Sequence, residues 1–264
     1  MPDDPLRMTV QEGVARIELH RPNAAHALDD AMASALAEAA IRCDEERAIR
    51  AVILTGSGRF FCSGGDLRAL ADAGSDRAAY IKRLTMHLHA ALSRFARMDP
   101  PMVVAVNGIA AGAGLSLSCI GDVILAAESA SCTVAYTGAG LVPDGGSTWW
   151  MPRLVGLRLA QELMLTNRRL SASEAVEAGL WSRVISDEQL ESEAANLATT
   201  LADGPVRAFG HTRRLLLSSG AESFETQMEL EARAIAEAAR GAEAEEGISA
   251  FLDKRSALFR NVPR

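Results

Sequence analysis

Two glycine-rich turns hold the residues of this chain that are best suited to chemistry. The first turn is Phe60-Phe61-Cys62-Ser63-Gly64-Gly65-Asp66-Leu67, and the second is Gly112-Ala113-Gly114. Small side chains let a ligand approach the backbone closely. A turn that leads from a strand into a helix also leaves unpaired N–H groups at the helix N-terminus, where negative charge is stabilised. Two such turns aimed at one point would form an oxyanion hole with two donors.

Strands and helices are expected to alternate around these turns. The sequence predicts a hairpin over residues 8–19, a helix from the N-cap Asp29 to about Glu46, and an amphipathic helix over 76–98. Further strands are expected at 51–55, from 102, at 122–127 and at 183–185, and further helices at 115–120, near Trp149 and after the capping box Ser171–Glu174. After about residue 187 only helices are expected, about four of them. This order indicates an α/β core with a helical appendage.

Composition excludes several classes of protein. Hydrophobic residues make up 48% of the 264 residues, which is typical of a globular protein, and the net charge of −7 gives no electrostatic footprint for nucleic acid. The four cysteines lack C-x-x-C spacing, so we expect reduced thiols and a cytoplasmic protein. Residues 100–121 carry no charge, but prolines and glycines interrupt them, so no membrane span is expected. No cluster with metal-ligand spacing occurs.

The chain also carries a set of motifs in a fixed order, namely HRPNAAHAL, AVILTGSGRFFCSGGDL, AVNGIAAGAGLSLSCIGD, GLVPDGGSTWWMPRLVG, LSASEAVEAGL and EGISAFLDKRS. Together they resemble the crotonase (enoyl-CoA hydratase/isomerase) superfamily over essentially the whole chain. The resemblance implies an α/β spiral of ββα units over residues 1–200 and a helical subdomain over 201–264 that builds homotrimers, often paired into hexamers. It implies acyl-CoA thioester substrates and no permanently bound cofactor, because the substrate itself carries coenzyme A.

The resemblance also assigns residues to the binding of the thioester. By position, the oxyanion donors would be the backbone N–H groups of Ser63 and Ala113, and one such donor is typically worth roughly 3–4 kcal/mol. The residues that match coenzyme A-binding positions are Arg21, Ala25, Ala27, Ser63, Gly64, Gly65, Asp66, Leu67 and Lys254. In this family the lysine near the C-terminus can come from a neighbouring subunit. An ordinary solvated lysine is an equally good interpretation of Lys254.

Both glutamates of a classical hydratase are missing. By resemblance the first should stand two residues after Gly114 and the second twenty residues later, where this chain has Ser116 and Tyr136. A general acid or base typically contributes 10²–10⁴-fold to a rate, so hydration of a simple enoyl-CoA should be crippled. Both hydroxyls could orient water, but with ordinary pKa values they are poor bases.

One carboxylate remains, in Gly140-Leu141-Val142-Pro143-Asp144-Gly145-Gly146. Asp144 matches the position of the single acidic residue in family isomerases, and its context most resembles the isomerase that acts on the ring-epoxide of phenylacetyl-CoA. One carboxylate beside an oxyanion hole suffices to remove a proton and return it to another carbon. From the residues alone, Asp144 could instead cap the helix that follows, and the two roles are compatible.

The same aspartate is the nucleophile in the chlorobenzoyl-CoA dehalogenases of the family, where a histidine acts as base. His89 falls at that histidine's position, although Tyr136 stands where those enzymes have tryptophan. We therefore predict an acyl-CoA isomerase with Asp144 as proton shuttle. The alternatives are an enoyl-CoA hydratase, a dehalogenase that uses Asp144 and His89, and a non-catalytic acyl-CoA-binding or RNA-binding homologue.

Overall fold

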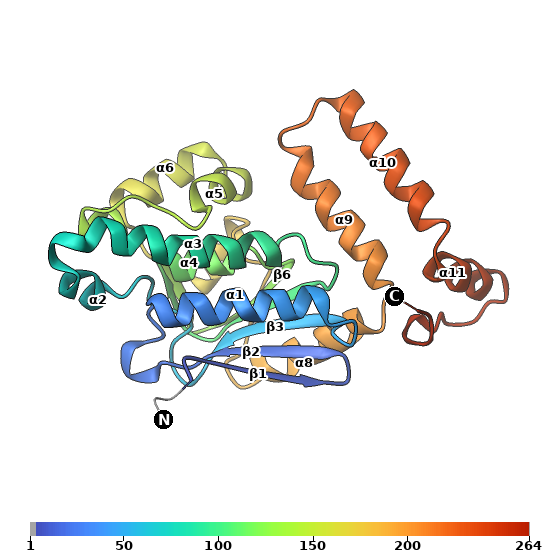
Figure 1. Ribbon diagram of the computed structural model, residues 1–264, viewed down its shortest axis with the longest axis horizontal. Helices are drawn as coiled ribbons and strands as arrows, with labels where there is room; N and C mark the ends of the chain where they lie inside the picture. Colours follow the sequence, from blue (N-terminus) through green and yellow to red (C-terminus); the bar gives the residue numbers. More distant parts are fainter. Residues whose placement is uncertain (1–3, 264) are drawn as a thin grey trace.

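A central sheet carries the architecture of the protein. The computed structural model describes residues 4–263, and within them six strands form a sheet in the order β1-β2-β3-β4-β6-β9 (Figure 1). The strands are β1 (Leu6–Gln11), β2 (Val14–Leu19), β3 (Ala51–Gly56), β4 (Met102–Val106), β6 (Val123–Ala127) and β9 (Arg183–Ile185). Only β1 and β2 are antiparallel; the other neighbours are parallel. The predicted hairpin and strands are confirmed.

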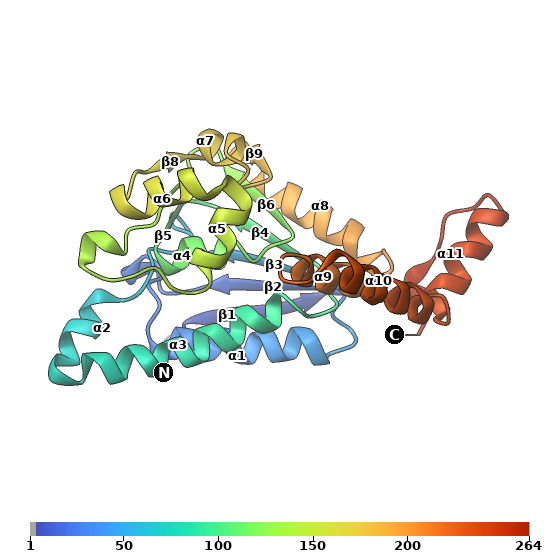
Figure 2. The same cartoon turned by 90° about the horizontal axis from the view of Figure 1, so that it is seen from above.

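Helices cover both faces of this sheet. Figure 2 shows α1 (Asp30–Glu45) and α3 (Arg77–Phe95) packed side by side on one face, with α8 (Leu190–Ala202) on the other. Every residue of β3 and β4 is buried, which explains their uninterrupted apolar sequence. The side chain of Asp29 caps α1 as predicted, by accepting a hydrogen bond from Met32 N–H at 2.9 Å.

A second, three-stranded sheet lies beside the first and was not predicted. It contains β5 (Ile109–Ala111), β7 (Ser131–Thr133) and β8 (Leu170–Ser171). Of the helices between β3 and α8, α4 (Ala113–Ser118) contacts β5, and α7 (Ala172–Glu177) contacts β7 and β8. The helix α2 (Leu67–Asp72) packs against α3, and α5 (Ser147–Val155) packs against α6 (Leu157–Thr166). The first helix after β4, which is α4, thus begins at Ala113, two residues earlier than the predicted start at Leu115. The predicted capping box of Ser171 and Glu174 is present.

Backbone pairing brings the two glycine-rich turns together. Cys62 N–H donates to Ile109 O at 3.0 Å, and Ala111 N–H donates to Cys62 O at 2.9 Å. The approach is so close that a Cβ on Gly114 would lie 2.2 Å from Cys62 O, and one on Gly64 would lie 2.9 Å from Ala111 O. Glycine is therefore required at both positions, and the two turns form one unit.

The chain ends in an arm of three helices, α9 (Val206–Ser219), α10 (Phe224–Ala238) and α11 (Ala242–Leu252). Figure 1 shows this arm projecting away from the sheet, and no described residue of α10 is buried. With α8, these helices confirm the prediction of four C-terminal helices. The boundary predicted between residues 200 and 201 falls in the last turn of α8, which packs on the sheet.

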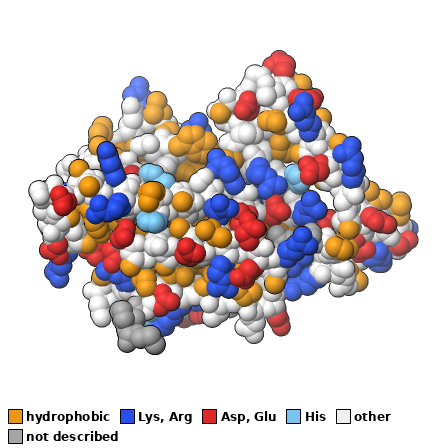
Figure 3. Space-filling model, in the orientation of Figure 1, with side chains coloured by type: hydrophobic (Ala, Val, Ile, Leu, Met, Phe, Trp, Pro, Cys, Tyr) orange, Lys and Arg blue, Asp and Glu red, His pale blue; other side chains and the backbone are white. Residues whose placement is uncertain are grey.

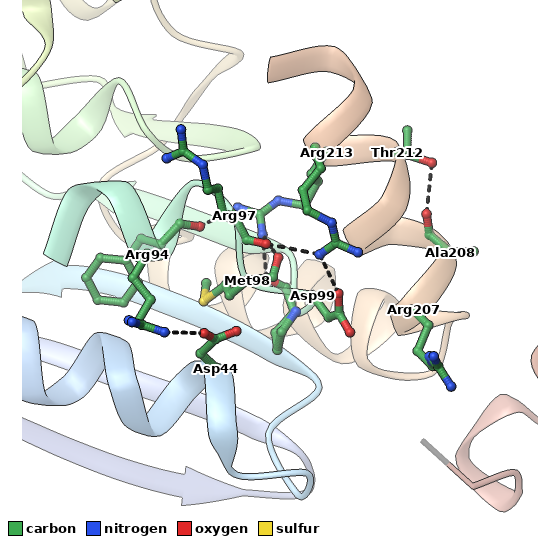
Figure 4. A network of polar contacts seen from close by, with 12 residues as sticks. Asp44, Arg94, Arg97, Met98, Asp99, Arg207, Ala208, Thr212 and Arg213 are labelled. Atoms are coloured by element: carbon green, nitrogen blue, oxygen red, sulfur yellow. Dashed lines mark hydrogen bonds and ion pairs between the residues drawn. The ribbon is translucent and has the colours of Figure 1, made fainter. Parts of the chain in front are cut away.

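A buried arginine, Arg213 of α9, attaches the arm to the core. The guanidinium of Arg213 forms an ion pair with Asp122 (2.7 Å) and donates to Phe95 O (2.6 Å) and Met98 O. Figure 4 shows Arg213 inserted beside Met98, close to the ion pair of Arg94 with Asp44. Figure 3 shows that Lys and Arg side chains gather on this face, where the end of α3 approaches the arm.

Two composition-based expectations can be compared with the structure. The four cysteines are buried free thiols, and burial raises the pKa of each to about 12, so they stay protonated. Within residues 4–263, none of the helices combines the length and the apolar character that crossing a membrane would require.

Candidate active site

A cavity of about 190 Å³ lies where the two glycine-rich turns meet α3 and the loop before α5. Gly65, Ala113, Tyr136 and Asp144 line it together with apolar side chains. The remaining lining residues are Asp66, Leu67, Leu70, Tyr80, Ile81, Leu84, Thr85, Leu88, Leu141 and Val142. The cavity therefore combines an apolar wall with a few polar groups, which is the usual character of a small-molecule site.

The backbone donors of this cavity differ from the prediction at one position. Ser63 N–H donates to Ala25 O at 3.0 Å, so it is already engaged and the assignment of Ser63 as an oxyanion donor is wrong. Gly65 lies two residues further on and forms a parallel bridge with Leu28. Leu28 bonds to Gly64 O and Asp66 N–H, so the N–H of Gly65 is directed to the opposite side.

The predicted donor Ala113 is the first residue of α4, where helical N–H groups lack partners. Within the described residues, neither Gly65 N–H nor Ala113 N–H donates a hydrogen bond to another protein group. The Cβ position of Gly64 is 3.5 Å from Ala113 N, which shows how closely the two turns approach. The pair that lines the cavity with available N–H groups is thus Gly65 and Ala113.

Asp144 does not cap the helix that follows it. The N-cap of α5 is Gly146, and no side chain caps this helix. The contribution of Asp144 to the turn is its carbonyl oxygen, which accepts from Ser147 Oγ (2.9 Å) and Ser116 Oγ (2.9 Å). The carboxylate of Asp144 is therefore not used to cap α5. It lines the cavity, where it contacts Tyr136 and His89.

Tyr136 holds one oxygen of that carboxylate. Its hydroxyl donates to Asp144 Oδ1 at 2.5 Å and lies 3.5 Å from Ser116 Oγ. Burial, repulsion from Asp144 and the hydrogen bond to Asp144 raise the pKa of Tyr136 well above its usual range. The phenol stays protonated and acts as a donor. The two positions that hold glutamates in a hydratase thus support Asp144 here.

His89 approaches the other oxygen. Its Nε2 lies 3.8 Å from Asp144 Oδ2 and accepts a hydrogen bond from Gly145 N–H at 3.4 Å. The side chain of His89 is 53% exposed, against 27% for Asp144. The structure thus brings together His89, Asp144 and Tyr136 as the sequence predicted, and no group of potential metal ligands occurs among residues 4–263.

Comparison with known proteins gives the same family that the motifs indicate. The family model described as enoyl-CoA hydratase/isomerase matches residues 9–262. The chain belongs to the enoyl-CoA hydratase/isomerase family. Members of this crotonase family act on acyl-CoA thioesters, and the α/β fold with its ββα units and helical C-terminal region is the crotonase fold.

Relatives within this family differ in their reactions. The chain is 37% identical to the 1,2-epoxyphenylacetyl-CoA isomerase of Escherichia coli (95% of this chain, 96% of the relative). It is 31% identical to 4-chlorobenzoyl coenzyme A dehalogenase-1 of an Arthrobacter species (83% and 80%). A crystal structure of an enoyl-CoA hydratase from Polaromonas sp. JS666 superposes with a TM-score of 0.91 at 29% identity (96% and 98%).

Two segments are expected to bind coenzyme A, the loop 21–27 and the turn 63–67, and they lie against each other. Ala25 and Ala27 belong to the loop that leads to α1, and their carbonyl oxygens accept from Ser63 N–H and from the Arg21 guanidinium. Ala25 has a left-handed backbone (φ 47°), as does the buried His26 (φ 56°). The sequence analysis did not single out His26, which accepts from Arg21 N–H (2.9 Å) and donates to Ser57 O (2.8 Å), thereby fixing the loop.

Arg21 and Asp66 are engaged with each other. Arg21 Nη2 lies 3.0 Å from Asp66 Oδ2 and 3.1 Å from Asp29 Oδ2, and Asp66 Oδ1 caps α2 by accepting from Ala69 N–H at 3.1 Å. Burial acts to raise the pKa of Asp66, but the bonds from Ala69 and Arg21 outweigh it and lower the pKa. The side chains of Arg21 and Asp66 thus shape the site from within the protein.

Lys254 lies apart from the cavity of its own chain. It follows α11 directly, is exposed and has a left-handed backbone (φ 54°). In Figure 1, α11 is at the far end of the arm, on the opposite side of the molecule from α2. A single chain therefore does not bring Lys254 to Gly65 and Asp144.

Proposed function

We propose that this protein is an acyl-CoA isomerase in which Asp144 moves a proton between two carbons of the acyl group. The observation that carries the proposal is the placement of the Asp144 carboxylate. It lines the same cavity as the available N–H groups of Gly65 and Ala113, and it neither caps a helix nor pairs with a Lys or Arg side chain in the described residues. Ser116 and Tyr136 replace the hydratase glutamates, which favours isomerisation over hydration.

Each polar group of the cavity has one role in the proposed reaction. Asp144 Oδ2 takes the proton from the carbon next to the thioester carbonyl, and the electron pair of that C–H bond delocalises onto the carbonyl oxygen. Gly65 N–H and Ala113 N–H stabilise the resulting enolate oxygen. Tyr136 holds Oδ1, which fixes the carboxylate in place. Transfer of the proton from Asp144 to another carbon of the conjugated system completes the isomerisation and regenerates the carboxylate.

The size of the cavity supports a compact acyl group. Cavities of about 150 Å³ lined by apolar side chains bind benzene, and the cavity here is about 190 Å³. The relative in Escherichia coli is named for an epoxide of phenylacetyl-CoA. A ring-epoxide of phenylacetyl-CoA is therefore the substrate we propose to test first.

We further propose how coenzyme A and the subunits are arranged. The nucleotide part would lie along the loop 21–27 and the turn 63–67, with Lys254 supplied by a neighbouring chain. Residues 1–200 would form the spiral core, and residues 201–264 the subdomain that builds homotrimers or hexamers. The apolar side chains of Phe224, Ile235 and Phe251 are more than two-thirds exposed on the arm, as expected of a surface that a partner covers. No resident cofactor is needed, and a cytoplasmic location is proposed.

Hydrogen exchange at the carbon next to the thioester tests the proposed base. Phenylacetyl-CoA is incubated in D₂O with the wild type or with Asp144→Asn, and deuterium uptake is followed by mass spectrometry. Isomerisation of the ring-epoxide of phenylacetyl-CoA is measured in parallel. We expect exchange and isomerisation by the wild type and loss of both in the variant. Equal exchange by the two proteins would remove Asp144 from the mechanism.

A dehalogenase is the second candidate, because His89 lies 3.8 Å from Asp144 as a base beside a nucleophile would. The Arthrobacter relative is named for 4-chlorobenzoyl-CoA. Release of chloride from 4-chlorobenzoyl-CoA, without isomerisation, would favour this candidate. Turnover of crotonyl-CoA would favour a hydratase, and acyl-CoA binding without any turnover would favour a non-catalytic homologue.

A further inference from the structure

Asp144 lines one of two neighbouring cavities, and the next residue, Gly145, lines the other. The first is the cavity with Gly65 and Ala113. The second is a larger cavity of about 590 Å³ between α3, α5 and α9, to which Asp144 itself does not contribute. His89, Gly145, Gly146, Trp149 and Trp150 are among its lining residues. His89 is thus the titratable side chain that contacts Asp144 from the second cavity.

The two carboxylate oxygens of Asp144 have different surroundings. Oδ1 accepts from the Tyr136 hydroxyl at 2.5 Å, and that phenol retains its proton. A proton taken up by Asp144 therefore resides on Oδ2, since Oδ1 is already hydrogen-bonded to a donor. The ion-pair contact of Oδ2 is with His89, whose Nε2 is 3.8 Å away. A small rotation of the imidazole or one bridging water closes this distance.

We propose that His89 carries protons between Asp144 and the water of the second cavity. This inference rests on the proposed role of Asp144 as the base. Gly145 N–H donates to His89 Nε2 at 3.4 Å, so the lone pair of this nitrogen points toward the loop that carries Asp144. With 53% of its side chain exposed, the same ring also reaches solvent.

The proton balance of the relay is simple. After abstraction, Asp144 is a neutral acid with the proton on Oδ2 and the substrate is an enolate. The O–H bond breaks as His89 Nε2 accepts the proton, which leaves a carboxylate beside an imidazolium. Protons on the imidazolium exchange with water, and Nε2 then returns one proton to Oδ2. No charge is gained or lost, but a hydrogen that came from the substrate has been replaced by one from solvent.

Deuterium content of the product tests the relay. The ring-epoxide of phenylacetyl-CoA is isomerised in D₂O by the wild type, His89→Gln and the matched control His87→Gln, and deuterium per product molecule is measured. His87 is on the same helix but lines neither cavity. We expect the deuterium content of each product molecule formed to fall about tenfold or more in H89Q and to be unchanged in H87Q.

Rescue by a free base separates a relay from a structural role. The variant His89→Ala leaves space beside the 590 Å³ cavity, and we expect added imidazole to restore deuterium uptake in proportion to its concentration. Wild-type deuterium content in H89Q would overturn the relay, as would turnover by the wild type without any deuterium uptake. Absence of both turnover and exchange in the wild type would overturn the proposed function, and the relay with it.

Discussion

Two carboxylates line the same cavity, yet they lie in regions with opposite properties. Asp66 is held by the N–H groups that begin α2 and by the Arg21 guanidinium, so its hydrogen-bonding capacity is used within the protein. Asp144 is held on one oxygen by Tyr136 and leaves the other for a loose contact with His89. The difference indicates that the Asp66 side maintains the shape of the site, whereas the Asp144 side leaves one carboxylate oxygen without a close hydrogen bond.

The largest effect should come from Asp144→Asn, which keeps the shape of the side chain and removes its basicity. We expect kcat for isomerisation to fall by about 10²–10⁴-fold with little change in the midpoint of thermal unfolding. Steady-state kinetics and calorimetry check the two parts. A loss below about fivefold would contradict the assignment of Asp144 as the base.

Tyr136→Phe should reduce activity by releasing Asp144 Oδ1. A hydrogen bond to a charged group is worth about 1.5–3 kcal/mol, so we expect kcat to fall about 10-fold to 100-fold. The matched control is Tyr80→Phe, because Tyr80 lines the same cavity but, within residues 4–263, its hydroxyl does not bond to Asp144. Comparable losses in both variants would show that the cavity, rather than the Tyr136–Asp144 bond, is responsible.

Asp66→Ala should act mainly on stability. It removes the N-cap of α2 and one partner of Arg21, which retains Asp29 at 3.1 Å. We expect the free energy of unfolding to decrease by about 1–2 kcal/mol, measured by urea denaturation. The isosteric Asp144→Asn serves as the comparison, since its unfolding midpoint should stay near that of the wild type. If D66A left the unfolding curve unchanged, the view of Asp66 as a structural carboxylate would be wrong.

The smallest expected effect is that of Asp66→Asn on the stability of the folded protein at acid pH. The pKa of Asp66 is lowered in the folded state, so its contribution to stability is present above its unfolded pKa, about 3.9, and is lost as pH falls through the folded pKa. Replacement by Asn removes this contribution. The stability difference between wild type and Asp66→Asn should therefore shrink as pH falls from about 6 to about 3. A constant difference over this range would contradict the lowered pKa.

Much of this arrangement follows from the sequence, because long apolar strands and capped helices carry strong local signals. Gly65 was expected to bind coenzyme A, but its available N–H group was not predicted, because Ser63 was assigned as the donor. Ser63 and Gly65 are both small turn residues with the same local pattern, and the choice between them depends on pairing with Leu28, which is distant in the sequence. The side chains of a strand alternate, and so do its N–H groups, so a non-local bridge decides which of them are free.

The second sheet and the start of α4 were missed for a similar reason. Strands β5, β7 and β8 contain two or three residues each, which is too short for a recognisable alternation. Their existence depends on partners such as Cys62, which bridges to Ala110. By contrast, Asp144, Tyr136 and His89 were each assigned by their match to positions of the crotonase family, and the structure places Tyr136 and His89 2.5 Å and 3.8 Å from the Asp144 carboxylate.

The bridge between Cys62 and Ala110 also has a consequence for folding kinetics. Neither glycine-rich turn is held in place by its own neighbours alone, since the hydrogen bonds that fix them join residues almost fifty positions apart. Closing so long a loop is slow compared with the formation of helices such as α1 and α3. In a refolding experiment, helical circular dichroism should therefore recover first. Activity should return later, once the distant segments that contain Cys62 and Ala110 have paired.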